Sequence, residues 1–286
     1  MSATFRIACV QVNAGGDIDA NVAAASALVR EARSAGAELV ALPECVALME
    51  SKRDRVRALA TSEEASAPLA SFRALARETG AWLLAGTVIV TAEDGRLANR
   101  SCLIAPDGSL RARYDKIHMF DVDLPGGESY RESATYRPGE SAVTAALPWG
   151  TLGMTVCYDV RFPHLYRALA HAGADFISVP SAFTRQTGTA HWHVLLRARA
   201  IETGAYVFAP AQCGEHPGKR LTYGHALIVD PWGAVLADAG EAPGFVVAEI
   251  DVAKVIEARR AIPSLAHERP FAAPQLAPHP EQKAAE

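Results

Sequence analysis

The chain has 286 residues, half of them hydrophobic, so it can bury a large core as one big domain or two ordinary ones. A net charge of -4 and scattered Lys and Arg residues argue against a nucleic acid partner. No window reaches the ~18 apolar residues of a membrane helix, and the first residues do not read as a secretory leader. We therefore expect a protein without a membrane or nucleic acid partner.

Five cysteines are odd in number, widely spaced and free of any C-x-x-C pair. This pattern predicts neither a disulfide framework nor a zinc cluster. Reduced thiols are typical of the cytoplasm, so we expect a cytoplasmic protein.

Short β-branched and apolar runs alternate with alanine-rich helical stretches, which is typical of strands with helices on their outer faces. In the first half, the sequence predicts strands over 5–12, 38–44, 81–90, 99–106 and 111–116 and helices over 17–37 and 53–79. A long surface loop is expected from there to about residue 140, and such loops inside compact domains are usually functional.

The second half repeats this style. It predicts helices over 164–173 and 190–204, strands over 151–157, 174–180, 205–210 and 244–250, a loop over 211–224 and a hairpin over 225–239. Two β-rich halves with helices outside each predict an α/β fold in the form of a four-layer αββα sandwich, within residues 1–270. The Pro- and Ala-rich residues 271–286 predict a loose tail.

Three predicted strands end in a chemically reactive side chain: Glu44, Lys116 and Cys157. Taken singly, the two charged residues read as solvated loop residues and the cysteine as a small core residue. If the strands are neighbours in a sheet, however, their ends meet in one crevice. A carboxylate there can take the thiol proton, and an ammonium can lower the thiol pKa and hold the charge that grows on a carbonyl oxygen. The backbone N–H of Tyr158 can complete an oxyanion hole.

The segments around these residues resemble the Glu, Lys and Cys motifs of the nitrilase superfamily of carbon-nitrogen hydrolases. They read LPECVAL, YDKIHMFDVDLPGGESYRESATYRPG and GMTVCYDVRFPHLYRALAHAGADFISVPSAF. The likeness runs from about residue 5 to 270. Residues 187–233 are most similar to the branch of deaminated glutathione amidases.

The resemblance implies a nitrilase-type αββα fold, a homodimer, and a reaction that needs no cofactor or metal. It also implies a second active-site glutamate on the long loop. Both Glu132 and Glu128 are candidates, and Glu132 is preferred because the family motif runs Glu-Ser a short way before Pro-Gly, as ESATYRPG does here.

The implied activity is hydrolysis of a small amide through a thioester on Cys157. The branch implies that deaminated glutathione is cleaved to 2-oxoglutarate and Cys-Gly. An ω-amidase that releases ammonia from α-ketoglutaramate is the alternative. A non-catalytic binding protein on the same scaffold is a third interpretation, from a different class.

Substrate contacts are expected from Tyr158, Phe183, Thr184 and Arg161, the middle two because their strand should lie beside the Cys157 strand. Arg161 has two interpretations: a structural salt bridge to Asp159 or the loop, which we favour, or a bond to a substrate carboxylate. In the loop over 211–224, Lys219 and Arg220 could bind the terminal carboxylate of a longer substrate, although exposed basic residues more often only face water.

Three histidines need an interpretation as well. His118 shares a side with Lys116 if the strand continues, and it is the alternative base for the thiol, although a supporting contact is the preferred role. His191 and His193 are two apart in a predicted helix, so they cannot jointly hold one metal ion. We read them as packing and hydrogen-bonding residues or as a pocket wall.

Overall fold

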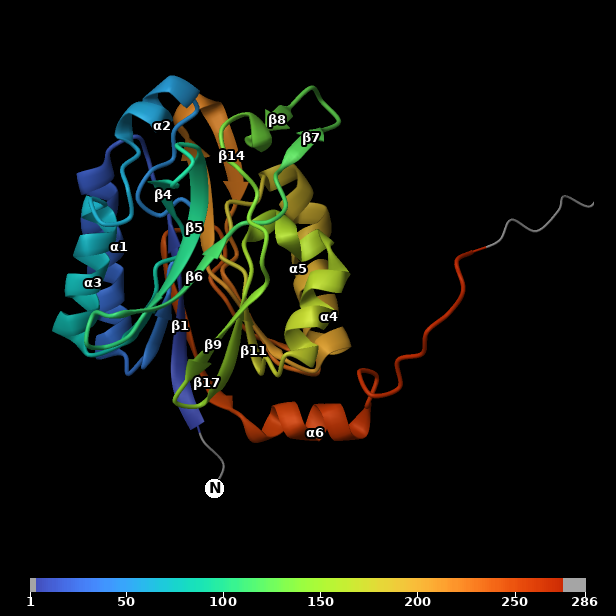
Figure 1. The fold of residues 1–286 in the computed structure, drawn as a ribbon. Coiled ribbons are helices and arrows are strands. Elements are labelled where there is room, and N and C mark those ends of the chain that lie inside the picture. Colours follow the sequence, from blue (N-terminus) through green and yellow to red (C-terminus); the bar gives the residue numbers. More distant parts are fainter. Residues whose placement is uncertain (1–3, 275–286) are drawn as a thin grey trace, which may run out of the picture.

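Two sheets stack face to face in the computed structural model of the protein, which describes residues 4–274, and helices cover both outer faces (Figure 1). The helices α1 and α3 cover the first sheet, whereas α4 and α5 cover the second. This arrangement confirms the predicted αββα sandwich. The helices are α1 (Ile18–Ser34), α2 (Arg53–Leu59), α3 (Ala67–Thr79), α4 (Pro163–His171), α5 (Arg185–Thr203) and α6 (Ala253–Ala261).

The first sheet has nine strands and the second has six. In the first, the order is β14 (Arg220–Tyr223), β13 (Ala211–His216), β1 (Thr4–Val12), β2 (Leu39–Ala41), β3 (Trp82–Leu84), β5 (Leu97–Ile104) and β4 (Val88–Thr91), with β17 (Gly244–Asp251) on β1 and β6 (Leu110–Asp115) on β5. In the second, the order is β16 (Val235–Asp238), β15 (Leu227–Val229), β12 (Tyr206–Ala209), β11 (Phe176–Ser178), β10 (Gly150–Met154) and β9 (Val143–Leu147).

The side chains of β1 show why the layers form. Phe5 and Ile7 lie in the core that faces the second sheet, whereas Ala8 and Val10 lie in the core under α1 and α3. Successive side chains of a strand point to opposite faces, so an uninterrupted apolar strand needs cover on both sides. One apolar run therefore joins two cores.

Three segments of the first half are divided where the sequence analysis predicted single elements. The predicted strand 81–90 divides into β3 and β4. The helical stretch 53–79 breaks into α2 and α3 because Ser66 caps a new helix, accepting from the Leu69 N–H, with a proline in the first turn. The predicted loop up to residue 140 contains the short hairpin of β7 (Asp121–Asp123) and β8 (Ser129–Arg131), followed by the 3-10 turn η1 (Glu132–Ala134).

The prediction of a loop over 211–224 was wrong. These residues form β13 and β14, an antiparallel pair joined by the turn η3 (Pro217–Lys219), and β13 also pairs with the end of β1. The Pro-Gly dipeptide that indicated a loop is the hairpin turn, where Gly218 and Lys219 have φ of 80° and 62°. The sequence analysis also missed β9 and α6; α6 buries only Val255, so its apolar periodicity is weak.

The carboxyl ends of β2, β6 and β10 meet at one end of the sandwich. The strands β1, β2 and β3 are parallel, and β6 runs with β3 because both are antiparallel to β5. However, β10 belongs to the facing sheet. The condition that the three strands neighbour one another in one sheet is therefore not met, and their ends meet instead across the gap between two sheets.

The described part of the chain ends beyond α6. Residues 271–274 are exposed, and the rest of the predicted tail, residues 275–286, lies outside the described residues. Within residues 4–274, no helix combines the length and apolar character that crossing a membrane requires.

Candidate active site

Cys157 lies in a sharp turn between β10 and α4, at the start of the 3-10 turn η2 (Cys157–Arg161). Its φ is 49°, in the left-handed region that non-glycine residues rarely adopt. The turn is held because the Cys157 N–H donates to the Pro180 carbonyl at 3.0 Å and the Val156 N–H to Asp159 Oδ2 at 2.8 Å. This local strain turns the chain sharply at the sulfur-bearing residue.

Asp159 ties this turn to the first sheet. Its buried carboxylate accepts from the Tyr114 hydroxyl at 2.7 Å and from the His118 backbone N–H at 3.0 Å, and His118 Nδ1 lies 2.7 Å away. The His118 ring stacks on Phe162 with centroids 3.5 Å apart. Because β6 ends at residue 115, His118 is not in a strand, so the argument that a strand would place it on the side of Lys116 was wrong.

Glu44 is fixed through its backbone and its side chain. Gly86, with a φ of 26°, packs so closely on the Glu44 segment that a Cβ there would overlap the Pro43 carbonyl. Gln212 Nε2 donates to the Glu44 carbonyl at 3.0 Å, and the Ala182 N–H donates to Glu44 Oε2 at 2.9 Å. The carboxylate is thus aimed before any substrate arrives.

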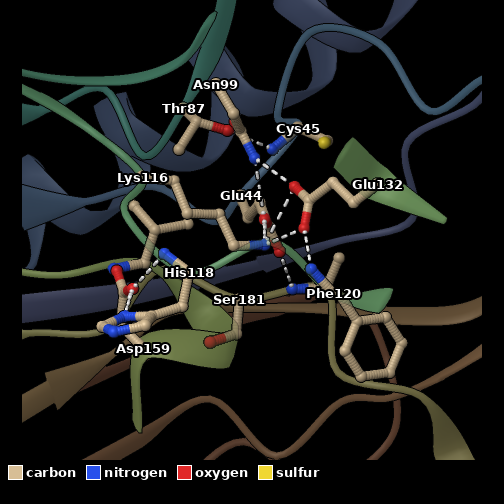
Figure 2. A network of polar contacts seen from close by, with 12 residues as sticks. Glu44, Cys45, Thr87, Asn99, Lys116, His118, Phe120, Glu132, Asp159 and Ser181 are labelled. Atoms are coloured by element: carbon tan, nitrogen blue, oxygen red, sulfur yellow. Dashed lines mark hydrogen bonds and ion pairs between the residues drawn. The ribbon is translucent and has the colours of Figure 1, made fainter. Parts of the chain in front are cut away.

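Lys116 lies between two carboxylates (Figure 2). Its Nζ is 2.9 Å from Glu44 Oε1 and 2.8 Å from Glu132 Oε2, and its side chain is 2% exposed. Glu132 Oε2 also accepts from the Phe120 N–H at 2.7 Å. The structure brings Glu132 to the lysine, whereas Glu128 is exposed and bonds Tyr130.

Asn99, on β5, is a member of this network that the sequence analysis missed. Its Nδ2 donates to Glu44 Oε1 at 2.9 Å and to Glu132 Oε1 at 3.3 Å (Figure 2). The signal for it was weak, because Arg100 and Ser101 follow Asn99 in β5, so the asparagine does not stand out as a lone polar residue.

The charges of this network stabilise one another. Burial alone would raise the pKa of Glu44, but the Lys116 charge, hydrogen bonds from Lys116 and Cys157, and the charge of Arg220 lower it below its usual value. Burial alone would lower the pKa of Lys116, but Glu132 and Glu44 raise it well above its usual value. The resting site therefore holds an ionised carboxylate beside an ammonium.

The Cys157 thiol stays protonated. Burial raises its pKa, and the charge of Glu44 and a hydrogen bond to that carboxylate add to the rise, while Lys116 lowers it. The expected lowering by the Lys116 ammonium is present, but desolvation of a residue that is only 6% exposed outweighs it.

One pocket of about 440 Å³ opens above these groups. Glu44, Lys116, Glu132 and Cys157 line its floor, and its other lining residues include Asn99, Glu128, Tyr130, Tyr158, Phe183, Thr184, Lys219 and Arg220. Of the predicted substrate contacts, Tyr158, Phe183 and Thr184 thus lie at the pocket. The predicted adjacency of β10 and β11 is also present.

Arg161 stands behind the pocket wall. Its guanidinium lies 5.2 Å from the ring centre of Phe183 and 5.9 Å from that of Tyr158, and Nη2 is 3.3 Å from His191 Nδ1. The favoured interpretation of a salt bridge to Asp159 or the loop was wrong, since within residues 4–274 no carboxylate pairs with Arg161.

His191 and His193 contact different partners, as the helical spacing predicts. His193 joins His225 and Asp238, whose potential ligand atoms all lie within 4.8 Å of one another. His225 Nδ1 is 2.9 Å from Asp238 Oδ1, and His193 Nε2 is 3.1 Å from Oδ2. These hydrogen bonds account for the cluster without an ion.

Comparisons with known proteins agree with this geometry. The carbon-nitrogen hydrolase family matches residues 6–260. A protein of Synechocystis sp. named deaminated glutathione amidase is 44% identical over 270 residues, covering 92% of this chain and 97% of that protein.

Two solved structures have the same fold. The NitFhit protein of C. elegans is 37% identical with a TM-score of 0.87, and the match covers 94% of this chain and 66% of that longer protein. A glutamate-to-glutamine variant of the amidase from Nesterenkonia sp. AN1, in which acrylamide has added to the active-site cysteine, is 27% identical with a TM-score of 0.77, covering 90% and 97%. With a family match over most of its length, this chain belongs to the carbon-nitrogen hydrolases of the nitrilase superfamily.

Proposed function

We propose that this carbon-nitrogen hydrolase cleaves deaminated glutathione to 2-oxoglutarate and Cys-Gly, with Cys157 as nucleophile. The observation that carries the proposal is the meeting of Cys157, Glu44, Lys116 and Glu132 at the floor of one pocket. The substrate is proposed from relatives over 40% identical that bear the name deaminated glutathione amidase.

In the first half-reaction, Glu44 takes the proton of Cys157 as the sulfur attacks the amide carbon. The Lys116 ammonium and the Tyr158 N–H hold the negative charge on the former carbonyl oxygen. The carbon-nitrogen bond then breaks, and the nitrogen leaves with the proton from Glu44. A thioester remains on the sulfur.

In the second half-reaction, Glu44 takes a proton from water, and the hydroxide attacks the thioester carbon. The carbon-sulfur bond breaks, the acid leaves, and the sulfur regains the proton. Glu132 keeps Lys116 in place through both steps because it pairs with the ammonium in the resting enzyme, and Asn99 keeps Glu44 and Glu132 in place because its amide donates to both carboxylates.

The raised pKa of the thiol makes proton transfer part of the attack. A preformed thiolate would place a second anion beside Glu44 in a buried site, which desolvation disfavours. When the sulfur attacks the substrate, the negative charge develops on the former carbonyl oxygen next to Lys116 and not on the sulfur. The site therefore stabilises the transition state more than the resting thiolate.

The test compares wild type with Cys157→Ala on deaminated glutathione and on α-ketoglutaramate, with the released amine measured. The substitution should reduce kcat/KM at least about 10⁴-fold. Intact-mass spectrometry should detect a 2-oxoglutaryl adduct on wild type and on Cys45→Ala, a control that removes another pocket thiol, but not on Cys157→Ala.

Three outcomes contradict the proposal in different ways. Ammonia release from α-ketoglutaramate without Cys-Gly turnover would favour the ω-amidase alternative. Substrate binding without turnover would favour a binding protein. An active Cys157→Ala protein would exclude this nucleophile.

We also propose a homodimer, supported by apolar side chains left exposed on and near α5. Ile201, Trp232 and Ile262 are more than half exposed and line one hollow, and Val194 is 67% exposed. Light scattering should give twice the chain mass, and Ile201→Glu should lower it; a monomeric wild type would overturn the idea.

The five unpaired cysteines support a cytoplasmic location.

A further inference from the structure

Arg220 is a second cation at the pocket, separate from Lys116. It is the first residue of β14 and lines the pocket beside the β7–β8 hairpin. Its guanidinium lies 5.2 Å from the ring centre of Tyr130, and its Nη2 donates to the Ala182 carbonyl at 2.6 Å. The neighbouring Lys219 is exposed and has no such contacts within residues 4–274.

Arg220 lacks an anionic partner. No carboxylate of the described residues lies within salt-bridge distance of it, and its Nε is buried without a hydrogen-bond partner among them. A half-buried guanidinium that uses only one carbonyl leaves planar donors unsatisfied. A carboxylate that enters the pocket can satisfy two of these donors at once.

The position of Arg220 relative to Glu44 decides which part of the substrate it meets. Arg220 binds the carbonyl of Ala182, and the N–H of the same residue donates to Glu44 Oε2. Glu44 hands its proton to the departing nitrogen, so the leaving group must lie against Glu44. Arg220 therefore borders the leaving-group side of the pocket.

We propose that Arg220 is a specificity residue that binds the terminal carboxylate of a peptide-like leaving group. This inference rests on the proposed function, and it assigns the glycine carboxylate of the Cys-Gly portion to Arg220. Ammonia, the leaving group of a primary amide, has no carboxylate to offer. Arg220 thereby favours a substrate with a dipeptide amine over α-ketoglutaramate.

The experiment measures kcat/KM for deaminated glutathione and for an analogue whose glycine carboxylate is a carboxamide. Wild type should prefer the acid by about 30-fold or more, as the loss of a charged hydrogen-bond pair predicts. Arg220→Gln should reduce this preference below about threefold, with most of the change in KM. The preference is a ratio within one protein, so general damage to the catalytic step cancels.

Arg185→Gln is the matched control, because it removes an exposed guanidinium next to Thr184 that is not among the residues lining the pocket. It should keep the wild-type preference. Equal loss of activity by Arg220→Gln on deaminated glutathione and α-ketoglutaramate would overturn the inference, because it would place Arg220 on the acyl side. A full preference in Arg220→Gln would overturn it while leaving the proposed function intact. An inactive wild type would overturn both.

Discussion

The floor and the wall of the pocket differ in how their cations are neutralised. On the floor, Lys116 contacts two carboxylates, and Asn99 bonds both of them. At the wall, Arg220 faces the ring of Tyr130, and behind the wall Arg161 faces the rings of Tyr158 and Phe183. Neither guanidinium has a carboxylate partner among the described residues. The cation of the floor is paired with carboxylates without substrate, whereas the cations of the wall are not.

This difference separates chemistry from recognition. A buried charge is tolerable when it is paired, and a paired network holds its geometry without help from substrate. A guanidinium held over rings receives weaker compensation, about 0.5–2 kcal/mol per ring contact. A substrate carboxylate can pair with an unpaired guanidinium at the wall. Substitutions at the floor should therefore change mainly kcat, and substitutions at the wall should change mainly KM.

The largest expected effect follows from removing the floor cation. Lys116→Met should lower kcat/KM at least about 10³-fold, because the growing oxyanion loses its partner. It should also lower the free energy of unfolding by about 3–5 kcal/mol, since Glu44 and Glu132 then face each other in a buried site. Steady-state kinetics and urea unfolding measure the two effects, and Lys219→Met is the control. A Lys116→Met protein with a kcat/KM within tenfold of wild type would break the comparison.

A smaller effect is expected at the wall. Arg161→Gln should raise KM about tenfold for both deaminated glutathione and α-ketoglutaramate while kcat changes less than about threefold, because Tyr158 and Phe183 at the pocket lose the guanidinium that packs behind them. Steady-state kinetics on both substrates provide the check. A fall confined to kcat would instead assign Arg161 to the catalytic floor.

The smallest effect concerns pH. In the proposed mechanism, the active form has Glu44 ionised and both Cys157 and Lys116 protonated. The pKa of Glu44 is lowered, so deprotonated Glu44 is lost only as the pH falls through the acid range. The pKa values of Lys116 and Cys157 are raised, so their protons are lost only at high pH. Thus kcat/KM should vary less than about threefold between about pH 6 and 9. A limb with a midpoint near neutrality would indicate a histidine base and contradict Glu44.

Much of this arrangement could be predicted because strand ends are visible in sequence. Apolar runs mark where strands stop, and Glu44, Lys116 and Cys157 stand at such stops. The layer that each strand joins depends on long-range pairing, so the facing-sheet position of Cys157 was not visible. Asn99 was missed because it begins the predicted strand beside Arg100 and Ser101, where it reads as an ordinary polar residue at a strand end. The net direction of the thiol pKa was not visible because burial is a property of the whole fold.

The prediction of a loop over 211–224 was wrong for a related reason. Local sequence there contains Pro, Gly and charged residues, which favour a loop. Pairing with the end of β1 and burial of Cys213 override that preference. The catalytic roles of the floor residues stay predictions that the variants above address.

The proton that burial keeps on Cys157 has a consequence for covalent inhibitors. Reagents that react with any available thiolate find little of it at neutral pH, so oxidants and simple alkylating agents should modify this cysteine slowly. A compound that presents an amide-like carbonyl to Lys116 would draw the proton onto Glu44 and create its own nucleophile. Selectivity toward such electrophiles is therefore a property of the resting enzyme.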